Sequence, residues 1–100
     1  MDWKDYLNEW GLSLRGLAQG GLHYGEDGEA GQVRYARIRE IALQMIDDGD
    51  AVTEEALQVW GAELVDMADA SLEEGLENPF DLDRYQVVRQ LGEKMRALGN

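Results

Sequence analysis

The sequence predicts an all-α protein of four helices, arranged like a bundle as two tandem helix pairs, and three observations support this. Apolar residues recur every three or four positions along four segments. No segment shows the sustained alternation of apolar and polar residues that is typical of a strand. Residues 1–50 also align with residues 51–100 without a gap. A chain of 100 residues fits one small domain.

The two halves of the chain match at 12 of 50 aligned positions. Two dipeptides recur in the same register: Trp10-Gly11 as Trp60-Gly61, and Arg34-Tyr35 as Arg84-Tyr85. A period near 50 is typical of a two-helix repeat. We therefore expect a duplication, with helix-pair repeat one at residues 1–50 and repeat two at 51–100, together forming one compact domain. The alternative is that two unrelated amphipathic helix pairs align by chance.

Apolar spacing places the helices. In the first helix the apolar stripe steps by 4, 3, 4 and 3 residues, and it comprises Trp3, Leu7, Trp10, Leu14 and Leu17. The third helix repeats the stripe as Leu57, Trp60, Leu64 and Met67. The second and fourth helices carry Tyr35, Ile38, Ala42 and Met45, or Tyr85, Val88, Leu91 and Met95. The predicted helices cover roughly residues 2–19, 32–47, 53–74 and 82–98.

Capping residues mark the helix ends. Thr53, followed by two glutamates, predicts the start of the third helix. Pro79 is expected to stop that helix, and Asp81 to cap the fourth. Gly49 and Gly99 are expected to terminate the second and fourth helices. The glycine-rich stretch before the second helix is expected to be a loop.

Charge and composition exclude several classes of partner. The net charge of −12 and pI near 4.2 disfavour nucleic acid and anionic membrane surfaces, because both would repel this chain. The absence of cysteine excludes disulfides and zinc–thiolate sites and fits a cytoplasmic protein. The first residues lack the pattern of a signal peptide, and no apolar run is long enough to span a membrane.

Residues for metal, phosphate or covalent chemistry are missing, so we expect no catalytic residue, no metal site and no cofactor. His23 is the single histidine and lies in a glycine-rich stretch. The acidic run at residues 47–50 has Gln58 or Val59 where an EF-hand needs a carboxylate. The glycines at residues 25–31 have neither the spacing of a dinucleotide fingerprint nor a strand before them.

One enzymatic alternative remains. Glu63 and Asp66 are three residues apart and share a helix face, within a segment rich in acids and free of positive charge. All-α nucleotide pyrophosphatases bind magnesium with such carboxylates. A matching pair on a second helix is missing, and Ser13 and Gly16 occupy the equivalent positions. We therefore interpret this segment as a solvated acidic face.

The repeated basic and aromatic residues are the candidate interaction site. This set comprises Trp10, Trp60, Arg34, Tyr35, Arg39, Arg84, Tyr85 and Arg89. Arginine can hold both oxygens of a carboxylate, so a clasp on the acidic helices is expected, within one repeat or across a dimer. Anion binding is the alternative. The tryptophans are expected to anchor the core or an interface.

Two segments carry a resemblance to a known family. "LAQGGLHYGEDGEAGQVRYARIREIALQMI" and "GLENPFDLDRYQVVRQLGEKMRAL" resemble the helical N-terminal domain that precedes the catalytic domain in a subset of Nudix hydrolases. The shared features are a Gly-Leu pair, an aspartate near a helix start, Arg-Tyr and a run like Arg-Glu-Ile-Ala. The resemblance implies a helical module that helps form a dimer and can border the substrate of a catalytic domain.

The Nudix catalytic box itself is absent. When Arg39-Glu40 is aligned with the box, Gly31, Leu43 and Gln44 stand where the magnesium-binding glutamates belong. The sequence therefore predicts a non-catalytic interaction module that forms a homodimer. The first alternative is an accessory subunit acting in trans with a Nudix nucleoside-diphosphate hydrolase, and the second is the magnesium-dependent pyrophosphatase.

Overall fold

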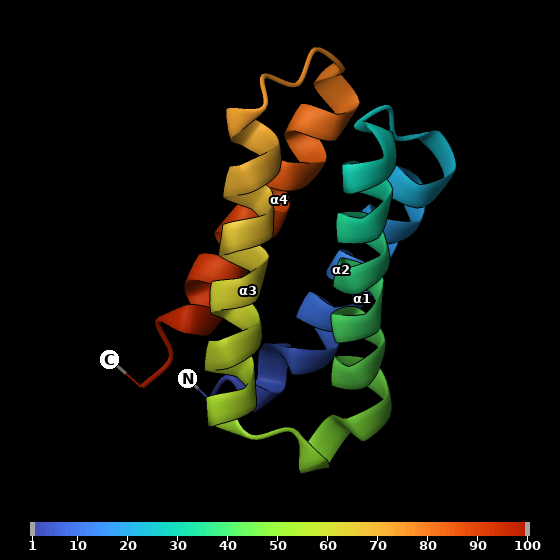
Figure 1. Ribbon diagram of the computed structural model, residues 1–100. Helices are drawn as coiled ribbons and strands as arrows, with labels where there is room; N and C mark the ends of the chain where they lie inside the picture. The colour runs from blue at the N-terminus through green and yellow to red at the C-terminus, as the bar shows by residue number, and fades with distance from the viewer. Residues whose placement is uncertain (1, 100) are drawn as a thin grey trace.

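The computed structural model describes residues 2–99, which form four α-helices that run alternately up and down (Figure 1). The helices are α1 (Lys4–Tyr24), α2 (Gly28–Asp48), α3 (Glu54–Glu73) and α4 (Pro79–Arg96), with a short 3₁₀ helix, η1 (Gly49–Ala51), between α2 and α3. No strand occurs in this part of the chain. The predicted all-α class is confirmed.

The first connection is shorter than predicted, because α1 and α2 both extend into the glycine-rich stretch. The prediction ended the first helix at residue 19, but α1 continues to Tyr24, so His23 lies in a helical turn and not in a loop. Gly21 explains the difference: a Cβ atom there would lie 2.3 Å from the ring of Tyr35. This glycine allows close packing inside the helix rather than ending it.

The start of α4 also differs from the prediction. Asn78, not Asp81, is the capping residue, and its side chain accepts hydrogen bonds from the backbone N–H groups of Phe80 and Asp81. Pro79 occupies the first helical position, where its missing N–H costs nothing. It does not stop α3, which ends at Glu73, before Gly75 with φ +77°.

Two other predicted boundaries, at Thr53 and Gly49, are confirmed. The side chain of Thr53 caps α3 by accepting a hydrogen bond from the N–H of Ala56 at 3.1 Å. Gly49 follows α2 with φ +44°, and Gly99 lies beyond α4 with φ +83°. Gly49 adopts a conformation that side chains disfavour directly after α2, which fits its predicted role, whereas α4 already ends at Arg96 with Ala97 as its cap, two residues before Gly99.

Neighbouring helices along the chain form two hairpins, α1 with α2 and α3 with α4. Gly11 and Gly61, the glycines of the repeated Trp-Gly dipeptides, lie where the two helices of each hairpin meet. A Cβ at Gly61 would lie 2.6 Å from the carbonyl oxygen of Gly92, and one at Gly11 would lie 2.9 Å from Ile46. The Trp-Gly dipeptides therefore mark positions at which the paired helices approach closely.

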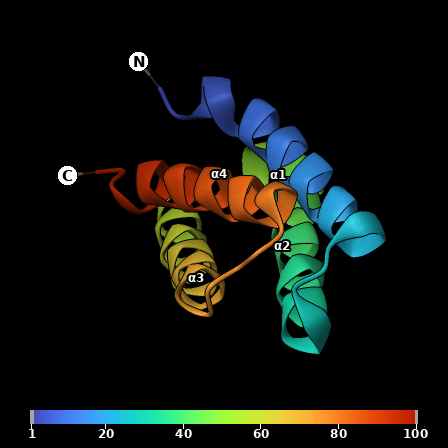
Figure 2. The same ribbon diagram turned by 90° about the horizontal axis from the view of Figure 1, so that it is seen from above.

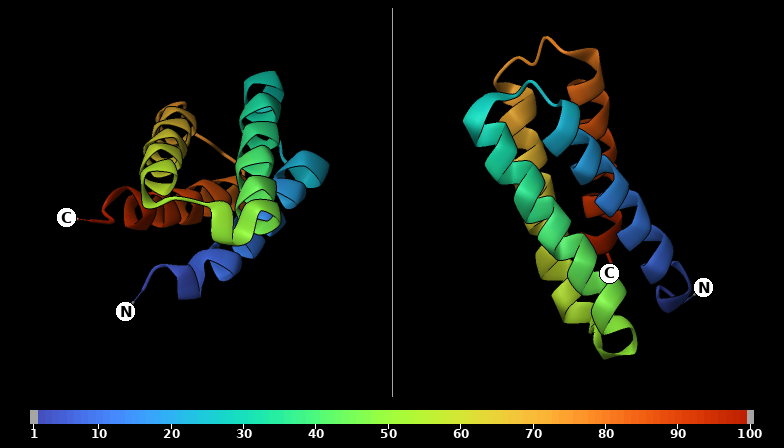
Figure 3. Two further views of the ribbon diagram at one scale, coloured as in Figure 1. Left: turned by 90° about the horizontal axis from the view of Figure 1, so that it is seen from below. Right: turned by 90° about the vertical axis from the view of Figure 1, so that its right-hand side faces the viewer.

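The two hairpins pack against each other as a four-helix bundle. Figure 2 shows α1 and α4 on one side of the molecule and α2 and α3 on the opposite side. The α1–α2 and α3–α4 connections share one end of the bundle, as Figure 1 and the right-hand view of Figure 3 show. We call this the loop end. Helices α1 and α3 are therefore diagonal neighbours, as are α2 and α4.

The core runs through both halves, and its buried positions recur at a spacing of 50. Matched residues are buried in both halves at Leu7/Leu57, Gly11/Gly61, Leu14/Leu64, Ala18/Ala68, Gly21/Ser71, Gly31/Asp81, Tyr35/Tyr85, Ile38/Val88, Ile41/Leu91, Ala42/Gly92 and Met45/Met95. The inward faces of matched helices are thus alike in position, and mostly in residue type.

Candidate interaction site

Two of the predicted interaction residues meet in the buried interior, between α2 and α4. Tyr35 on α2 and Tyr85 on α4 are fully buried, and their rings stack with centroids 4.8 Å apart and planes 18° apart. Such aromatic pairs contribute beyond the area that they bury. Because α2 and α4 belong to different hairpins, this stack joins the two halves of the chain.

Asp81 holds the hydroxyl of Tyr35 and is itself fully buried. The Tyr35 hydroxyl donates to Oδ1 of Asp81 at 2.6 Å, and Arg84 donates to the same oxygen at 3.1 Å. The N–H of Glu26 donates to Oδ2 at 2.7 Å. Burial, and then the hydrogen bond to Asp81, raise the pKa of Tyr35 above its ordinary value. Asp81 therefore ties the α1–α2 connection, α2 and α4 together.

A different set of residues surrounds Tyr85. Its hydroxyl donates to the carbonyl oxygen of Gly31 at 3.5 Å. Nearby, Ser71 donates to Oδ2 of Asp27 at 2.9 Å, and Arg34 donates to Ser71 at 2.9 Å. Burial raises the pKa of Tyr85 to about 12, and Asp27 contributes to the rise. Each buried tyrosine thus has a carboxylate of the other half nearby.

Sequence reasoning missed Asp81 and Asp27 as members of this polar cluster. Asp81 was expected to be a cap, and Asp27 lay in a predicted loop. A signal was available for Asp81, because Asn78 already provides a capping side chain three residues earlier. Asp27 carried no such signal, since its role depends on how the two hairpins meet.

Two of the predicted arginines hold carboxylates on α3 or just after it, one of them within a repeat and the other between the two repeats. Arg34 donates to Glu74, just after α3, at 2.9 Å across the two halves, and this bond raises the pKa of Arg34 while it lowers that of Glu74. Arg89 donates to Asp69 at 2.6 Å within the second half, which raises the pKa of Arg89. Both arginines thus reach α3 or its end from neighbouring helices.

Arg39 occupies the position that matches Arg89 but has no such partner. The residue that matches Asp69 is Gln19, and within residues 2–99 the Arg39 side chain makes no ion pair. It is exposed, and it borders a surface hollow between α1 and α2. The hollow is lined by Gln19, Leu22, His23 and Arg39. Of the predicted arginines, Arg39 is the one that faces solvent with its charge unmet.

Trp10 and Trp60 are half-buried and pack against the core from the edges of their helices. The Trp10 ring also stacks on Tyr6, with centroids 5.8 Å apart. Their position fits packing anchors within the hairpins.

Of the two carboxylates considered for magnesium, Glu63 is held in an ion pair and Asp66 is not. Arg37 donates to both carboxylate oxygens of Glu63, at 2.7 and 3.3 Å, whereas Asp66 is exposed. Among residues 2–99, no three histidine, aspartate or glutamate side chains gather closely enough to hold a metal ion. None of the four helices has an apolar stretch that could cross a membrane.

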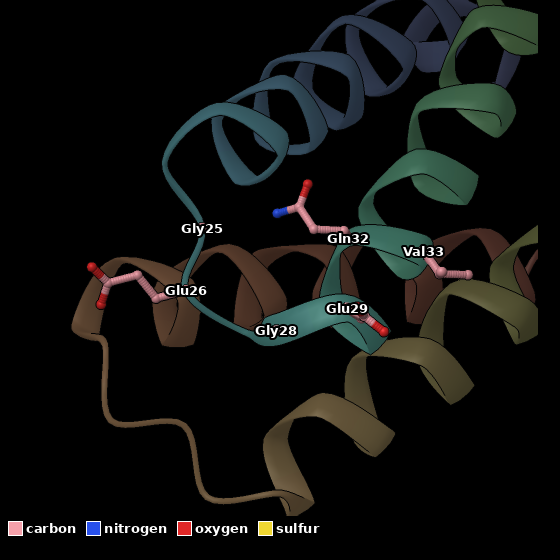
Figure 4. A pocket seen from close by; sticks show the side chains of 6 residues that line it. All are labelled: Gly25, Glu26, Gly28, Glu29, Gln32 and Val33. Carbon is pink, nitrogen blue, oxygen red and sulfur yellow. The ribbon is translucent and has the colours of Figure 1, made fainter.

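Figure 4 shows a second hollow, at the α1–α2 connection. It is lined by Gly25, Glu26, Gly28, Glu29, Gln32 and Val33. Gln32 donates to the carbonyl oxygen of Gly21 at 3.2 Å, so its amide is already used within the fold. The two glutamates give this hollow a negative charge, which would repel a phosphate.

Comparison with known protein families identifies the family of this chain. Residues 5–61 match the model of Nudix_N, described as a UDP-X-like, N-terminal oligomerisation domain. The match covers α1, α2, η1 and the first turns of α3, and it confirms the resemblance for the first of the two quoted segments. Comparison with curated proteins and with solved structures gave no match. The chain belongs to the Nudix_N family of oligomerisation domains.

Proposed function

We propose that this chain is a non-catalytic interaction module, made of two tandem copies of one helix pair, that forms a homodimer. One observation carries the proposal: matched positions are alike inside the bundle and different outside it. Similar inward faces let the two copies pair with each other. Different outward faces imply that each has a separate contact to make.

Within the module, the predicted site residues have two roles. Arg34, Tyr35, Arg84 and Tyr85 hold the two halves together through the buried polar cluster. Trp10 and Trp60 stiffen the hairpins, and Arg89 is held by α3. Arg39 remains for an external contact. Family membership supports self-association as the purpose of that contact.

Solution mass across a dilution series tests the proposal. We expect sedimentation velocity to show a species of twice the 11.2 kDa chain mass that dissociates on dilution. A chain that stays at 11.2 kDa at every concentration would contradict the homodimer. The non-catalytic part is tested separately, by incubating the protein with magnesium and UDP-linked substrates and expecting no hydrolysis.

A second candidate is an accessory subunit that acts in trans with a Nudix hydrolase. The family description supports it, because an N-terminal domain is by definition followed by something else in its relatives. We would add this chain to a Nudix hydrolase from which the N-terminal domain has been removed. Recovery of activity supports the accessory role, and unchanged activity favours the self-contained module.

A further inference from the structure

The outward faces of α1 and α3 differ most in charge. From residue 62 to 75, in the second part of α3 and the turn after it, the chain carries five acidic residues and no basic one. From residue 12 to 25, the matched part of α1 has no acidic residue and carries Arg15 and His23. Since the whole chain is strongly acidic, an acid-free segment of this length on its surface calls for an explanation.

Unpaired charges of opposite sign lie on these two faces. On the first half, neither Arg15 nor Arg39 makes an ion pair within residues 2–99. On α3, Asp66 and Glu73 are exposed and likewise make none with any described residue. We call Arg15, Gln19, Leu22, His23 and Arg39 the basic groove, and Asp66, Asp69 and Glu73 the acidic face. The acidic face follows one side of the helix, because its residues are three and four apart.

The second half shows what an arginine at this position binds. Arg89 holds the carboxylate of Asp69, which projects from the neighbouring helix, at 2.6 Å. Arg39 has the same backbone setting, but Gln19 takes the place of that carboxylate. The hollow beside Arg39 is therefore open at the point where the matched arginine is bound. No carboxylate among residues 2–99 fills it, so a carboxylate from another molecule has room to bind there.

We propose that the carboxylates come from a second copy of this chain, whose acidic face docks in the basic groove. The inference rests on the proposed self-association and adds to it which faces meet. Besides the charges, each face offers one exposed apolar residue, Leu12 on α1 and Val59 on α3, which are 41% and 68% exposed. An apolar contact beside complementary charges is the usual composition of a protein interface.

This contact is head-to-tail. The basic groove, on α1 and α2, and the acidic face, on α3, are different surfaces, and α1 and α3 lie diagonally across the bundle from each other (Figure 2). One contact between two copies therefore leaves a free groove on one copy and a free face on the other. Such heterologous association continues to longer assemblies unless the rotation closes a ring. The homodimer is then the first step of the assembly at low concentration.

Complementation between two variants tests the head-to-tail contact. The groove variant carries Arg15→Glu and Arg39→Glu, and the face variant carries Asp66→Lys and Glu73→Lys; Asp69 is kept because Arg89 binds it. Each variant alone should associate at least about tenfold more weakly than the original chain, because like charges then meet. An equimolar mixture should recover association, because the intact groove of the face variant meets the intact face of the groove variant, and the two reversed surfaces also carry opposite charges.

Matched controls separate this contact from a general charge effect. Lys4→Glu with Lys94→Glu changes the net charge as the groove variant does, and Asp47→Lys with Asp48→Lys changes it as the face variant does. Both controls should associate like the original chain, and circular dichroism should show all variants folded. Measurements at near-physiological salt keep contact pairs while screening the overall repulsion between acidic chains.

The outcomes distinguish the two proposals. If the original chain never associates, the proposed self-association fails, and the head-to-tail contact fails with it. If it associates but the variants behave like the original, or the mixture does not recover association, only the head-to-tail contact is overturned. Equal weakening by the controls would also overturn it, because net charge would then explain the effect.

Discussion

Tyr35 and Tyr85 occupy matched positions, but the carboxylates beside them come from different places in the sequence. Tyr35 binds Asp81, whose matched residue in the first half is Gly31. A Cβ at Gly31 would lie 2.3 Å from the Cβ of Asp27, so the side chain of Asp27 fills the space that Gly31 leaves. Each buried tyrosine therefore has a carboxylate beside it, although the two acids lie one helical turn apart when the two halves are aligned.

Arg39 and Arg89 lie on the outside of the bundle, and here only one of the two matched residues has a carboxylate partner. Their positions match, yet Arg89 has an acid beside it and Arg39 has none. Inside the bundle, a lost acid would leave buried donors unsatisfied, which costs stability. On the surface, water can satisfy the arginine, so a carboxylate beside it is not required for stability. Arg89 therefore makes a contact within the fold, whereas Arg39 makes no ion pair with any residue from 2 to 99.

The largest expected effect comes from the buried acids. Asp81→Ala should lower the free energy of unfolding by about 3–5 kcal/mol, because Arg84 and the Tyr35 hydroxyl lose their partner inside the protein. Asp27→Ala should cost about 1–3 kcal/mol, because Arg34 keeps Glu74. Urea unfolding of both variants measures the two losses. Equal losses would mean that the two carboxylates have the same role.

The next largest loss of stability is expected where the two helices of each hairpin pack closely together. Gly61→Ala should destabilise the protein by about 1–3 kcal/mol, because the new methyl group meets the backbone of α4 at 2.5–2.6 Å. Gly11→Ala should cost less, since it meets the flexible side chain of Ile46 at 2.9 Å. Gly16→Ala is the control: nothing lies within 4 Å of its Cβ, so it should stabilise α1 by about 0.5–1 kcal/mol. Thermal unfolding ranks the three, and a harmless Gly61→Ala would contradict the close approach of α3 and α4.

Alkaline pH probes the tyrosine stack itself. The folded state holds the pKa of Tyr35 and Tyr85 above their ordinary value, so both stay protonated when the unfolded chain loses its protons. Their contribution to stability is complete below about pH 10 and is lost as the pH rises further, by about 1.4 kcal/mol per pH unit for each tyrosine. Urea unfolding at several pH values measures the slope. Tyr35→Phe should remove the contribution of Tyr35 to this loss of stability with pH. If the dependence of the unfolding free energy on pH stayed the same in this variant, the result would count against the burial of Tyr35.

Much of the fold could be predicted from the sequence because it depends on local spacing. The apolar stripes gave the four helices, and Thr53 marked the start of α3. The predicted end of α1 was wrong because Gly20 and Gly21 suggest a loop. In the structure, Gly21 lies inside the helix and makes room for the ring of Tyr35 on α2, which is a contact between helices. In the same way, spacing indicated that the Arg-Tyr pairs matter, but not that the tyrosines of the two halves stack on each other. Contacts between distant segments carry no local signal.

The smallest expected change in stability comes from adding an acid beside Arg39. Gln19→Asp would place a carboxylate beside Arg39, as Asp69 lies beside Arg89, and an exposed pair of this kind should stabilise the chain by about 0.2–1 kcal/mol. The same substitution should weaken self-association, because Arg39 would then be neutralised from within its own chain. Gln19→Asn, which adds no charge, should leave both properties unchanged. If Gln19→Asp strengthened the chain but left self-association intact, Arg39 would not be part of the contact, and another surface of the first half would have to account for it.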